Sequence, residues 1–183
     1  KRSIHEIESL NKLFEKLLHL SEIESGIHRQ RFWQCDLAEI AATVVDMYEA
    51  YAEEKNLLLT LQSTVQARVW GDADLLASML SQLIENAIKH ARQAISVKVT
   101  ASGKHINLLV ADDGPGIPPD EYANIGQHFH QLNPDSSGFG LGMASVRAIL
   151  ALHDGKLGFD DNQPGLIVNI QLPVFEEPPG IRQ

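Results

Sequence analysis

The chain reads QLIENAIKHA at residues 82–91, DDGPGIP at 112–118 and GFGLGMA at 138–144, and these stretches decide how its 183 residues fold. The first belongs to a longer pattern in which apolar residues recur at steps of three and four: Leu75, Leu76, Met79, Leu80, Leu83, Ile84, Ala87 and Ile88. This spacing places them on one face of a helix. Asp72 precedes the pattern and is a favoured N-cap residue, so we predict a helix from Asp72 to about Ala91.

The same helix carries the polar residues Glu85, Asn86 and Lys89. Glu85 and Lys89 are four positions apart and face the same side, which is compatible with an ordinary exposed Glu–Lys pair. The alternative is a triphosphate site. Oxygens of Asn and Glu suit Mg²⁺, which also binds substrate phosphates, and a Lys supplies a positive charge to those phosphates.

Asp112 ends an apolar run from Ile106 to Ala111 and opens into Gly114-Pro115-Gly116. One interpretation is a turn in which the Asp binds local backbone and the glycines adopt positive φ. The other uses the same geometry for a ligand: glycines allow a flat ring to approach the backbone, and the carboxylate accepts a hydrogen bond from an exocyclic amine. This second interpretation favours adenine over guanine, because the 6-oxo group of guanine cannot donate.

Three alternating glycines, Gly138, Gly140 and Gly142, precede a predicted helix over 142–152. Backbone N–H groups at a helix N-terminus favour anions, so this pattern indicates either a phosphate-binding loop or a flexible turn. It is not the dinucleotide fingerprint, which follows a strand. Residues 118–137 before it show no period, and a loop of that length predicts a functional lid or disorder.

The other elements follow from their periodicity and turn residues. We predict helices over 4–23 and 36–53, strands over 32–35, 57–62, 67–70, 95–101, 105–111, 155–159 and 166–172, and a loose tail over 176–183. Trp33 and Trp70 are expected to fill the core. This order predicts an α/β (α+β) two-layer sandwich with a mixed sheet and helices on one face.

Composition excludes some classes of function. With 15 Lys+Arg and 24 Asp+Glu the net charge is −9, which argues against nucleic acid as a partner. Cys35 is the single cysteine, so the chain has no internal disulfide. No stretch is long and apolar enough for a membrane span, so no direct membrane contact is expected of this chain.

The helix over 4–23 has a broad apolar face that needs a cover, and a partner helix that includes a second chain is the economical one. The chain starts with Lys1 and runs straight into this helix. We therefore expect a fragment with three parts: a helical remnant at 1–27, a domain at 28–175 and a flexible tail at 176–183.

Taken together and in this order, the three quoted stretches resemble the N, G1 and G2 boxes of the nucleotide-binding fold shared by sensor histidine kinases, gyrase, Hsp90 and MutL. The resemblance implies ATP and Mg²⁺ as cofactors, with Asn86 holding Mg²⁺, Lys89 reaching the phosphates and Asp112 binding the adenine amine. It implies a catalytic role for Glu85, which polarises or deprotonates an attacking histidine. The further nucleotide-binding residues it implies are His90, Gly114, Gly116, Ile117, Phe129, Gly138, Gly140, Leu141 and Gly142.

Residues 17–26 also look like the end of the second dimerisation helix of sensor histidine kinases. This resemblance implies a protein histidine kinase that moves the γ-phosphoryl group of ATP to a histidine on an acceptor helix absent here. The phosphoryl group would then pass to an Asp of a response regulator receiver domain. Implied partners are ATP or ADP, the receiver domain and the protein's own dimerisation domain, in a homodimer. The implied location is the cytoplasmic side of an inner-membrane sensor.

Two features depart from the family pattern. Asp113 stands where Asn is frequent and is expected to add negative charge near an anionic ligand, and histidines flank Phe129 where basic residues are common. Two alternatives therefore stay open: a degenerate nucleotide-binding regulatory module without kinase activity, or another ATPase or serine kinase of the same fold.

Overall fold

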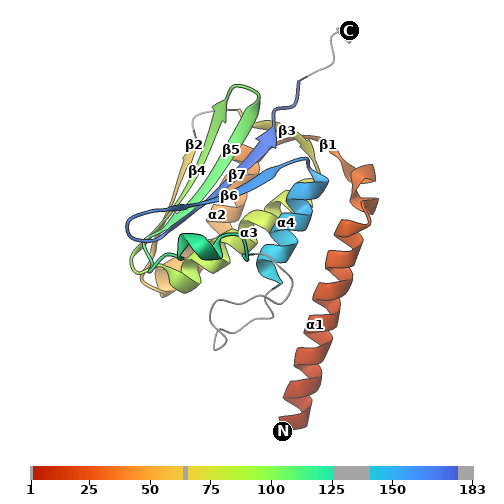
Figure 1. Ribbon diagram of the computed structural model, residues 1–183, viewed down its shortest axis with the longest axis vertical. Helices are drawn as coiled ribbons and strands as arrows, with labels where there is room; N and C mark the ends of the chain where they lie inside the picture. Colours follow the sequence, from red (N-terminus) through yellow and green to blue (C-terminus); the bar gives the residue numbers. More distant parts are fainter. Residues whose placement is uncertain (1, 64–65, 126–140, 177–183) are drawn as a thin grey trace.

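The computed structural model describes residues 2–63, 66–125 and 141–176. A five-stranded sheet in the order β2-β4-β5-β7-β6 forms its centre (Figure 1). The strands are β2 (Leu58–Ser63), β4 (Ala94–Ser102), β5 (His105–Asp112), β6 (Lys156–Asp161) and β7 (Leu166–Pro173). β2 and β4 are parallel and the other neighbours are antiparallel, which confirms the predicted mixed sheet.

Three helices cover one face of this sheet: α2 (Leu37–Glu54), α3 (Ala73–His90) and α4 (Gly142–Leu152) (Figure 1). The strands are apolar towards the helices, as in β4, where Ile95, Val97 and Val99 are buried and alternate with exposed residues. All eight apolar residues of the predicted stripe on α3 are buried, and Asp72 caps α3 by accepting from the backbone N–H groups of Asp74 and Leu75. The two-layer sandwich predicted from the sequence is confirmed.

A small second sheet pairs β1 (Trp33–Asp36) with β3 (Arg68–Gly71). The prediction that Trp33 and Trp70 fill the core is wrong, because they are 58% and 51% exposed. Trp70 pairs with Gln34 in the register, while Cys35 and Val69 share the buried face. Trp70 therefore lies on the outer face of the small sheet, where its ring stacks on Phe175 at 5.3 Å.

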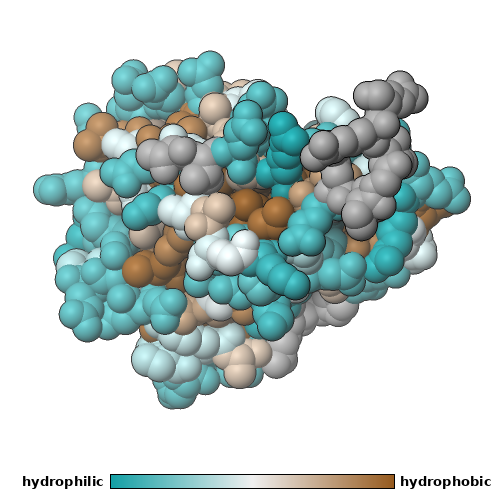
Figure 2. All heavy atoms as spheres, turned by 90° about the horizontal axis from the view of Figure 1, so that it is seen from above, coloured by the Kyte–Doolittle hydropathy of each residue, from teal (hydrophilic) through white to brown (hydrophobic). Residues whose placement is uncertain are grey.

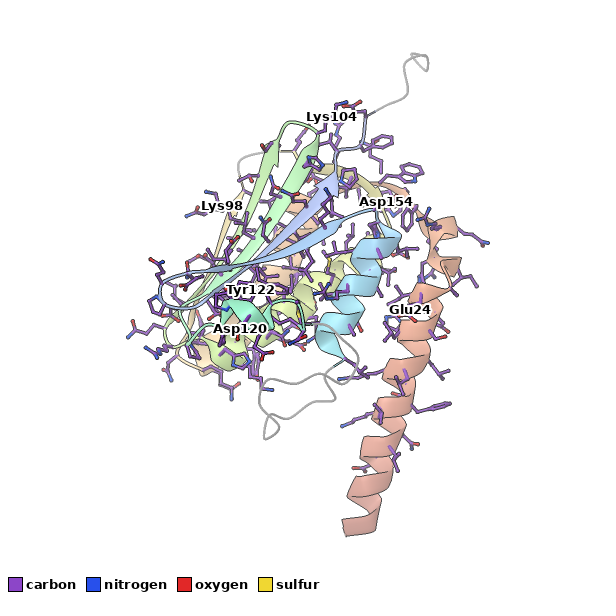
Figure 3. The ribbon with its side chains drawn as sticks, viewed as in Figure 1. Glu24, Lys98, Lys104, Asp120, Tyr122 and Asp154 are labelled. Atoms are coloured by element: carbon purple, nitrogen blue, oxygen red, sulfur yellow. The ribbon has the colours of Figure 1, made fainter. Side chains whose placement is uncertain are left out.

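An open pocket of about 550 Å³, lined in part by Trp70, Phe175, Arg29 and Lys104, lies beside this ring pair. Figure 2 looks onto this end of the molecule and shows apolar surface, in brown, between polar side chains. Lys104 precedes β5 and Asp112 ends it, so roughly 25 Å of strand separates this pocket from Asp112. Lys104 and Asp120 mark these two ends in Figure 3.

The long helix α1 (Arg2–Glu24) leaves the domain at its N-terminal end (Figure 1). Its C-terminal half packs on α4, where Leu20 forms a buried cluster with Leu141 and Ala144. From the sequence we expect a partner helix, with a second chain, to cover the apolar face of α1. In the structure α4 of the same chain covers part of that face. Other apolar residues of α1 are exposed: Leu10, Phe14 and Leu18. None of the helices in the described ranges combines the length and the hydrophobicity needed to cross a membrane.

Candidate nucleotide-binding site

The C-terminal half of α3 is bracketed by two glycines from distant parts of the chain. A Cβ added to Gly142, the first residue of α4, would lie 2.6 Å from the side-chain amide nitrogen of Gln82. A Cβ added to Gly114 would overlap the backbone carbonyl oxygen of His90. Gln82 and His90 are eight helical positions apart, so Glu85, Asn86 and Lys89 lie on the roughly 12 Å of helix between the two contacts. The structure therefore brings together the three stretches that the sequence singled out.

Asp112 is 7% exposed at the end of β5. Its Oδ1 accepts a hydrogen bond of 2.8 Å from the backbone N–H of Gly114. Burial raises the pKa of Asp112, while hydrogen bonds from the backbone of Gly114 and Leu166 and the charge of His90 act in the opposite direction. A carboxylate offers about four lone-pair positions, so this buried group is able to accept a further hydrogen bond from a ligand amine.

Residues in the turn between β6 and β7 contact the backbone carbonyl of Asp112, and the sequence did not reveal this contact. The Asn162 side-chain amide donates to the Asp112 carbonyl oxygen at 2.8 Å, and the Asn162 backbone N–H donates to Gly165 at 3.1 Å. Gly165 has φ +117°, and a Cβ there would overlap the same Asp112 carbonyl oxygen. Asn162 and Gly165 reach Asp112 because β7 pairs with β5, and a register of this kind leaves no local signal in the sequence.

The carboxylate of Asp113 has hydrogen-bond partners that the sequence did not suggest. Its carboxylate accepts hydrogen bonds from the backbone N–H groups of Arg92, at 2.8 Å, and Gln93, at 3.0 Å. The hydrogen bond from Gln93, the first of several from the backbone, lowers the pKa of Asp113. The Asp113 carboxylate thereby closes the connection between α3 and β4.

Glu85 is exposed on α3, and its Oε1 accepts a hydrogen bond of 2.5 Å from the hydroxyl of Tyr48 on α2. Burial, the hydrogen bond to Glu85 and the charge of Glu85 raise the pKa of Tyr48 to about 12, and a hydrogen bond with Ser81 partly offsets them. Tyr48 was not among the residues predicted from the sequence. The sequence alone does not show that Tyr48 contacts Glu85, because the contact forms only when α2 packs against α3.

The remaining polar residues of this half of α3 are accessible to a ligand. Asn86 is half-buried, whereas Lys89 and His90 are exposed. Desolvation and the neighbouring charge of Lys89 lower the pKa of His90, with Asp112 acting in the opposite direction. His90 is therefore a neutral, flat ring at neutral pH, close to the Gly114 loop.

Leu141 is the N-cap residue of α4 and makes no side-chain capping hydrogen bond, and backbone N–H groups at the start of a helix favour anions. The side chain of Leu141, another residue predicted to bind the nucleotide, is buried in the cluster with Leu20 of α1 and Ala144. Ile117 is half-buried in the loop after Gly116, whose φ is +73°. The predicted residues Phe129, Gly138 and Gly140 lie outside the described residues.

The sequence also missed Arg147, which holds the end of the loop after β5. Its Nε donates to the Ile125 carbonyl oxygen at 2.7 Å. This bond ties α4 to residues 119–125, which follow the Gly114 loop. An Arg in an otherwise apolar helix gives no sequence signal that separates such a contact from an ordinary exposed cation.

Within the described residues no group of three or more metal-ligating side chains forms a metal cluster. Mg²⁺ keeps several waters and binds through one or two protein oxygens plus substrate phosphates, so it does not require such a cluster. The half-buried Asn86 amide, one turn of helix from Lys89 and between the two glycine contacts, fits that type of site.

Comparison with known proteins agrees with this geometry. Residues 71–176 match the family model described as histidine kinase-, DNA gyrase B-, and HSP90-like ATPase. The chain is 30% identical over 164 residues to the sensor protein IrlS of Burkholderia pseudomallei, covering 86% of the chain and 35% of IrlS. It is 30% identical over 162 residues to the sensor protein QseC of Escherichia coli, covering 87% of the chain and 35% of QseC. The chain thus spans about a third of the length of these relatives.

Solved structures of histidine kinases have the same fold. The full-length kinase ShkA in complex with AMPPNP superposes with a TM-score of 0.78 at 24% identity, covering 90% of the chain and 36% of ShkA. The mycobacterial sensor histidine kinase MprB gives 0.67 at 26% identity, covering 78% of the chain and 97% of that structure. The catalytic domain of the kinase ThkA gives 0.71 at 23% identity, with 78% and 95% covered.

Proposed function

Because the chain belongs to the family of histidine kinase-, DNA gyrase B- and HSP90-like ATPases, we propose that it is the ATP-binding catalytic domain of a two-component sensor histidine kinase. The observation that carries the proposal is the buried carboxylate of Asp112, held by Gly114 and backed by Gly165 at one end of α3. An adenine amine would donate to this carboxylate. The whole protein would transfer the γ-phosphoryl group to a histidine of its dimerisation domain, and then to an Asp of a response regulator.

The division of labour follows the positions along α3. Asp112 and the Gly114–Gly116 loop would bind the base, with His90 beside it, and Lys89 and the N-terminus of α4 would bind the phosphates. Asn86 would hold Mg²⁺, which neutralises phosphate charge. Glu85 would accept the proton of the attacking histidine, because its exposed carboxylate lies on the same half of the helix.

The domain organisation is part of the proposal. Residues 1–27 would belong to the helical dimerisation domain and 28–175 would form the catalytic domain. The tail predicted at 176–183 lies outside the described residues from residue 177 onward. Phe129 and the glycines Gly138 and Gly140 would belong to a lid that closes over ATP. The kinase that contains this chain would be an inner-membrane sensor with this domain in the cytoplasm, and it would act as a homodimer.

Calorimetric titration of ADP and ATP, with and without Mg²⁺, tests the proposal. We expect Asp112→Asn to weaken binding about tenfold or more, because one charge-assisted hydrogen bond is lost and an amide donor faces the adenine amine. Glu85→Gln is the matched control, expected to leave the affinity within about twofold while it slows phosphotransfer in the full-length kinase. Equal loss of binding in both variants would contradict the assigned roles.

The same experiment separates the two alternatives. Binding of ATP without phosphotransfer by the full-length protein would support a regulatory module without kinase activity. Release of γ-phosphate to water, or phosphorylation of serine, would support another ATPase or serine kinase of this fold. No binding of either nucleotide would contradict the nucleotide site itself.

A further inference from the structure

We propose that the turn between β6 and β7, residues 162–165, sets how selectively the nucleotide site binds adenine. In this proposal Asn162 is a positioning residue, which acts through Asp112 and does not itself contact the nucleotide. The proposal rests on the proposed function and adds to it a segment outside the three sequence stretches that define the site.

The turn contacts Asp112 at both its backbone and its side chain. Ala111 of β5 pairs with Ile167 of β7, so the residues just before β7 lie beside the end of β5. The Asn162 side-chain amide donates to the Asp112 backbone carbonyl oxygen at 2.8 Å. The backbone of Leu166, directly after the turn, forms a hydrogen bond that favours the ionised form of the Asp112 carboxyl group. One short segment therefore holds the carbonyl and the carboxylate of the same residue.

The Asp112 carboxylate is held from its other side by the glycine loop. The Gly114 backbone N–H donates to Oδ1 at 2.8 Å. An aspartate side chain has only two rotatable bonds, so backbone donors on two sides favour one orientation. A carboxylate offers about four lone-pair positions, and these donors leave positions for the amine of a base. Movement of the turn would therefore change the direction in which the remaining lone pairs point.

The turn has a defined shape and also contacts the second glycine of the loop. Its own hydrogen bonds run from the Asn162 N–H to the Gly165 carbonyl oxygen, at 3.1 Å, and from the Gln163 N–H to Asp161 Oδ1, at 2.9 Å. A Cβ added to Gly116 would lie 2.9 Å from the Gly165 carbonyl oxygen. The turn thus touches both the residue proposed to bind the amine and the loop proposed to approach the ring.

The effect on selectivity follows from the chemistry of the 6-amine. Purine riboside 5′-diphosphate is ADP without that amine, so it has no donor for Asp112 at this position. The affinity ratio of ADP to this analogue measures how well the carboxylate is placed for the amine. A badly oriented carboxylate should reduce the affinity for ADP and leave that for the analogue nearly unchanged.

Gln163 provides a matched control, because it is the next residue of the turn and carries the same amide group. Both side chains are exposed, so neither replacement opens a cavity in the core. In calorimetric titrations of the present chain, Asn162→Ala should weaken ADP binding about fivefold, the usual effect of one lost hydrogen bond. Its affinity for purine riboside 5′-diphosphate should stay within about twofold of wild type. Gln163→Ala should leave both affinities unchanged.

Two further variants separate positioning from a merely structural role. Asn162→Asp keeps the shape of the side chain but loses the donor, so it should weaken ADP binding at least as much as Asn162→Ala. In an Asp112→Asn background, Asn162→Ala should cause no further loss of ADP affinity, because the group that it positions is already replaced. Wild-type affinity in Asn162→Asp, or an equal further loss in the Asp112→Asn background, would overturn the proposal.

The outcomes for the two nucleotides distinguish this inference from the proposed function. Equal losses of ADP and analogue affinity in Asn162→Ala would show a general distortion of the site and overturn the inference alone. Unchanged ADP affinity in Asn162→Ala would do the same. A wild-type chain that binds neither nucleotide would instead overturn the proposed function, and this inference with it. Thermal unfolding of each variant identifies any loss that comes from incomplete folding.

Discussion

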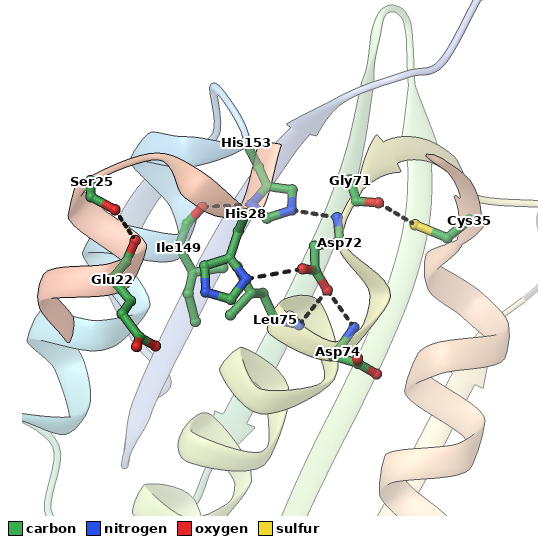
Figure 4. Close-up of polar contacts among 10 residues, drawn as sticks. All are labelled: Glu22, Ser25, His28, Cys35, Gly71, Asp72, Asp74, Leu75, Ile149 and His153. Carbon is green, nitrogen blue, oxygen red and sulfur yellow. Dashed lines mark hydrogen bonds and ion pairs between the residues drawn. The ribbon is translucent and has the colours of Figure 1, made fainter. Parts of the chain in front are cut away.

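Nδ1 of His28 lies 3.2 Å from Oδ2 of Asp72, and this contact joins the segment after α1 to the first turn of α3 (Figure 4). The other carboxylate oxygen of Asp72 caps α3 through the N–H groups of Asp74 and Leu75. The backbone N–H of Asp72 donates to Nε2 of His153, just after α4, at 3.0 Å. One buried aspartate thus connects the helical N-terminal part with the two helices that form the site.

Replacing Asp72 separates the two tasks of its carboxylate. Ser retains an oxygen that can cap α3 but lacks the second oxygen for His28, whereas Ala loses both. We expect Asp72→Ala to be less stable than Asp72→Ser by about 1 kcal/mol, the usual value of an N-cap. Urea unfolding measures both variants. His28→Ala should be destabilising in the wild-type chain and nearly neutral in Asp72→Ser, and an equal effect in the two would contradict the contact.

His153 makes stability depend on pH. It is buried, its Nδ1–H donates to the Ile149 carbonyl oxygen at 2.7 Å and its Nε2 accepts from Asp72, so it is held neutral. Burial lowers the pKa of His153 below 6.5, against the pull of Ile149 and of the Asp72 and Asp154 charges; the Arg29 charge lowers it further. Below about pH 6.5 the unfolded chain therefore binds a proton that the folded chain does not.

The free energy of unfolding should consequently fall as pH drops below about 6.5, with a slope from His153 of at most about 1.4 kcal/mol per pH unit. His153→Gln should reduce that slope, measured by urea unfolding at a series of pH values. The pKa of His90 is lowered as well, so the slope of His90→Gln is measured beside that of His153→Gln to separate the contributions of the two histidines. An unchanged slope in His153→Gln would show that His153 is accessible to protons in the folded state.

Substitutions at Gly165 and Gly103 separate the effect of a close contact with another part of the chain from the effect of backbone strain alone. Both have positive φ, but a Cβ at Gly103 would meet nothing within 4 Å, whereas one at Gly165 would overlap the Asp112 carbonyl oxygen. We expect Gly103→Ala to cost about 1 kcal/mol and Gly165→Ala several times as much. Gly165→Ala should also weaken ADP binding, because Asp112 has to move. Similar unfolding midpoints for the two variants would contradict the contact.

The packing of α1 on α4 can be tested with two leucines. Leu20 is 2% exposed in the cluster with Leu141, whereas Leu18 is 51% exposed. Leu20→Ala should cost about 2–3 kcal/mol and Leu18→Ala less than about 0.5 kcal/mol. Amide hydrogen exchange over residues 13–24 should become faster only in Leu20→Ala. Equal exchange in both variants would contradict the docking of α1.

The features that the sequence predicted correctly are those with a local cause. The apolar stripe from Leu75 to Ile88 and the cap at Asp72 predict α3, and Ser102-Gly103-Lys104 between two alternating runs predicts the β4–β5 hairpin. The glycines on either side of α3 were also recognised, although as ligand-binding positions. The structure adds that Gly114 and Gly142 are where two loops approach the helix itself.

The sequence by itself determined which segments are helical or extended, and it singled out the polar residues proposed for the site, because period, caps and turn residues act over a few positions. Only the tertiary structure decided that Asn162 and Gly165 support Asp112, that Tyr48 holds Glu85, that Asp113 closes a turn and that Trp70 lies outside the core. These relationships depend on strand register and helix packing. They arise from burying the whole apolar surface at once, which no short stretch of sequence encodes.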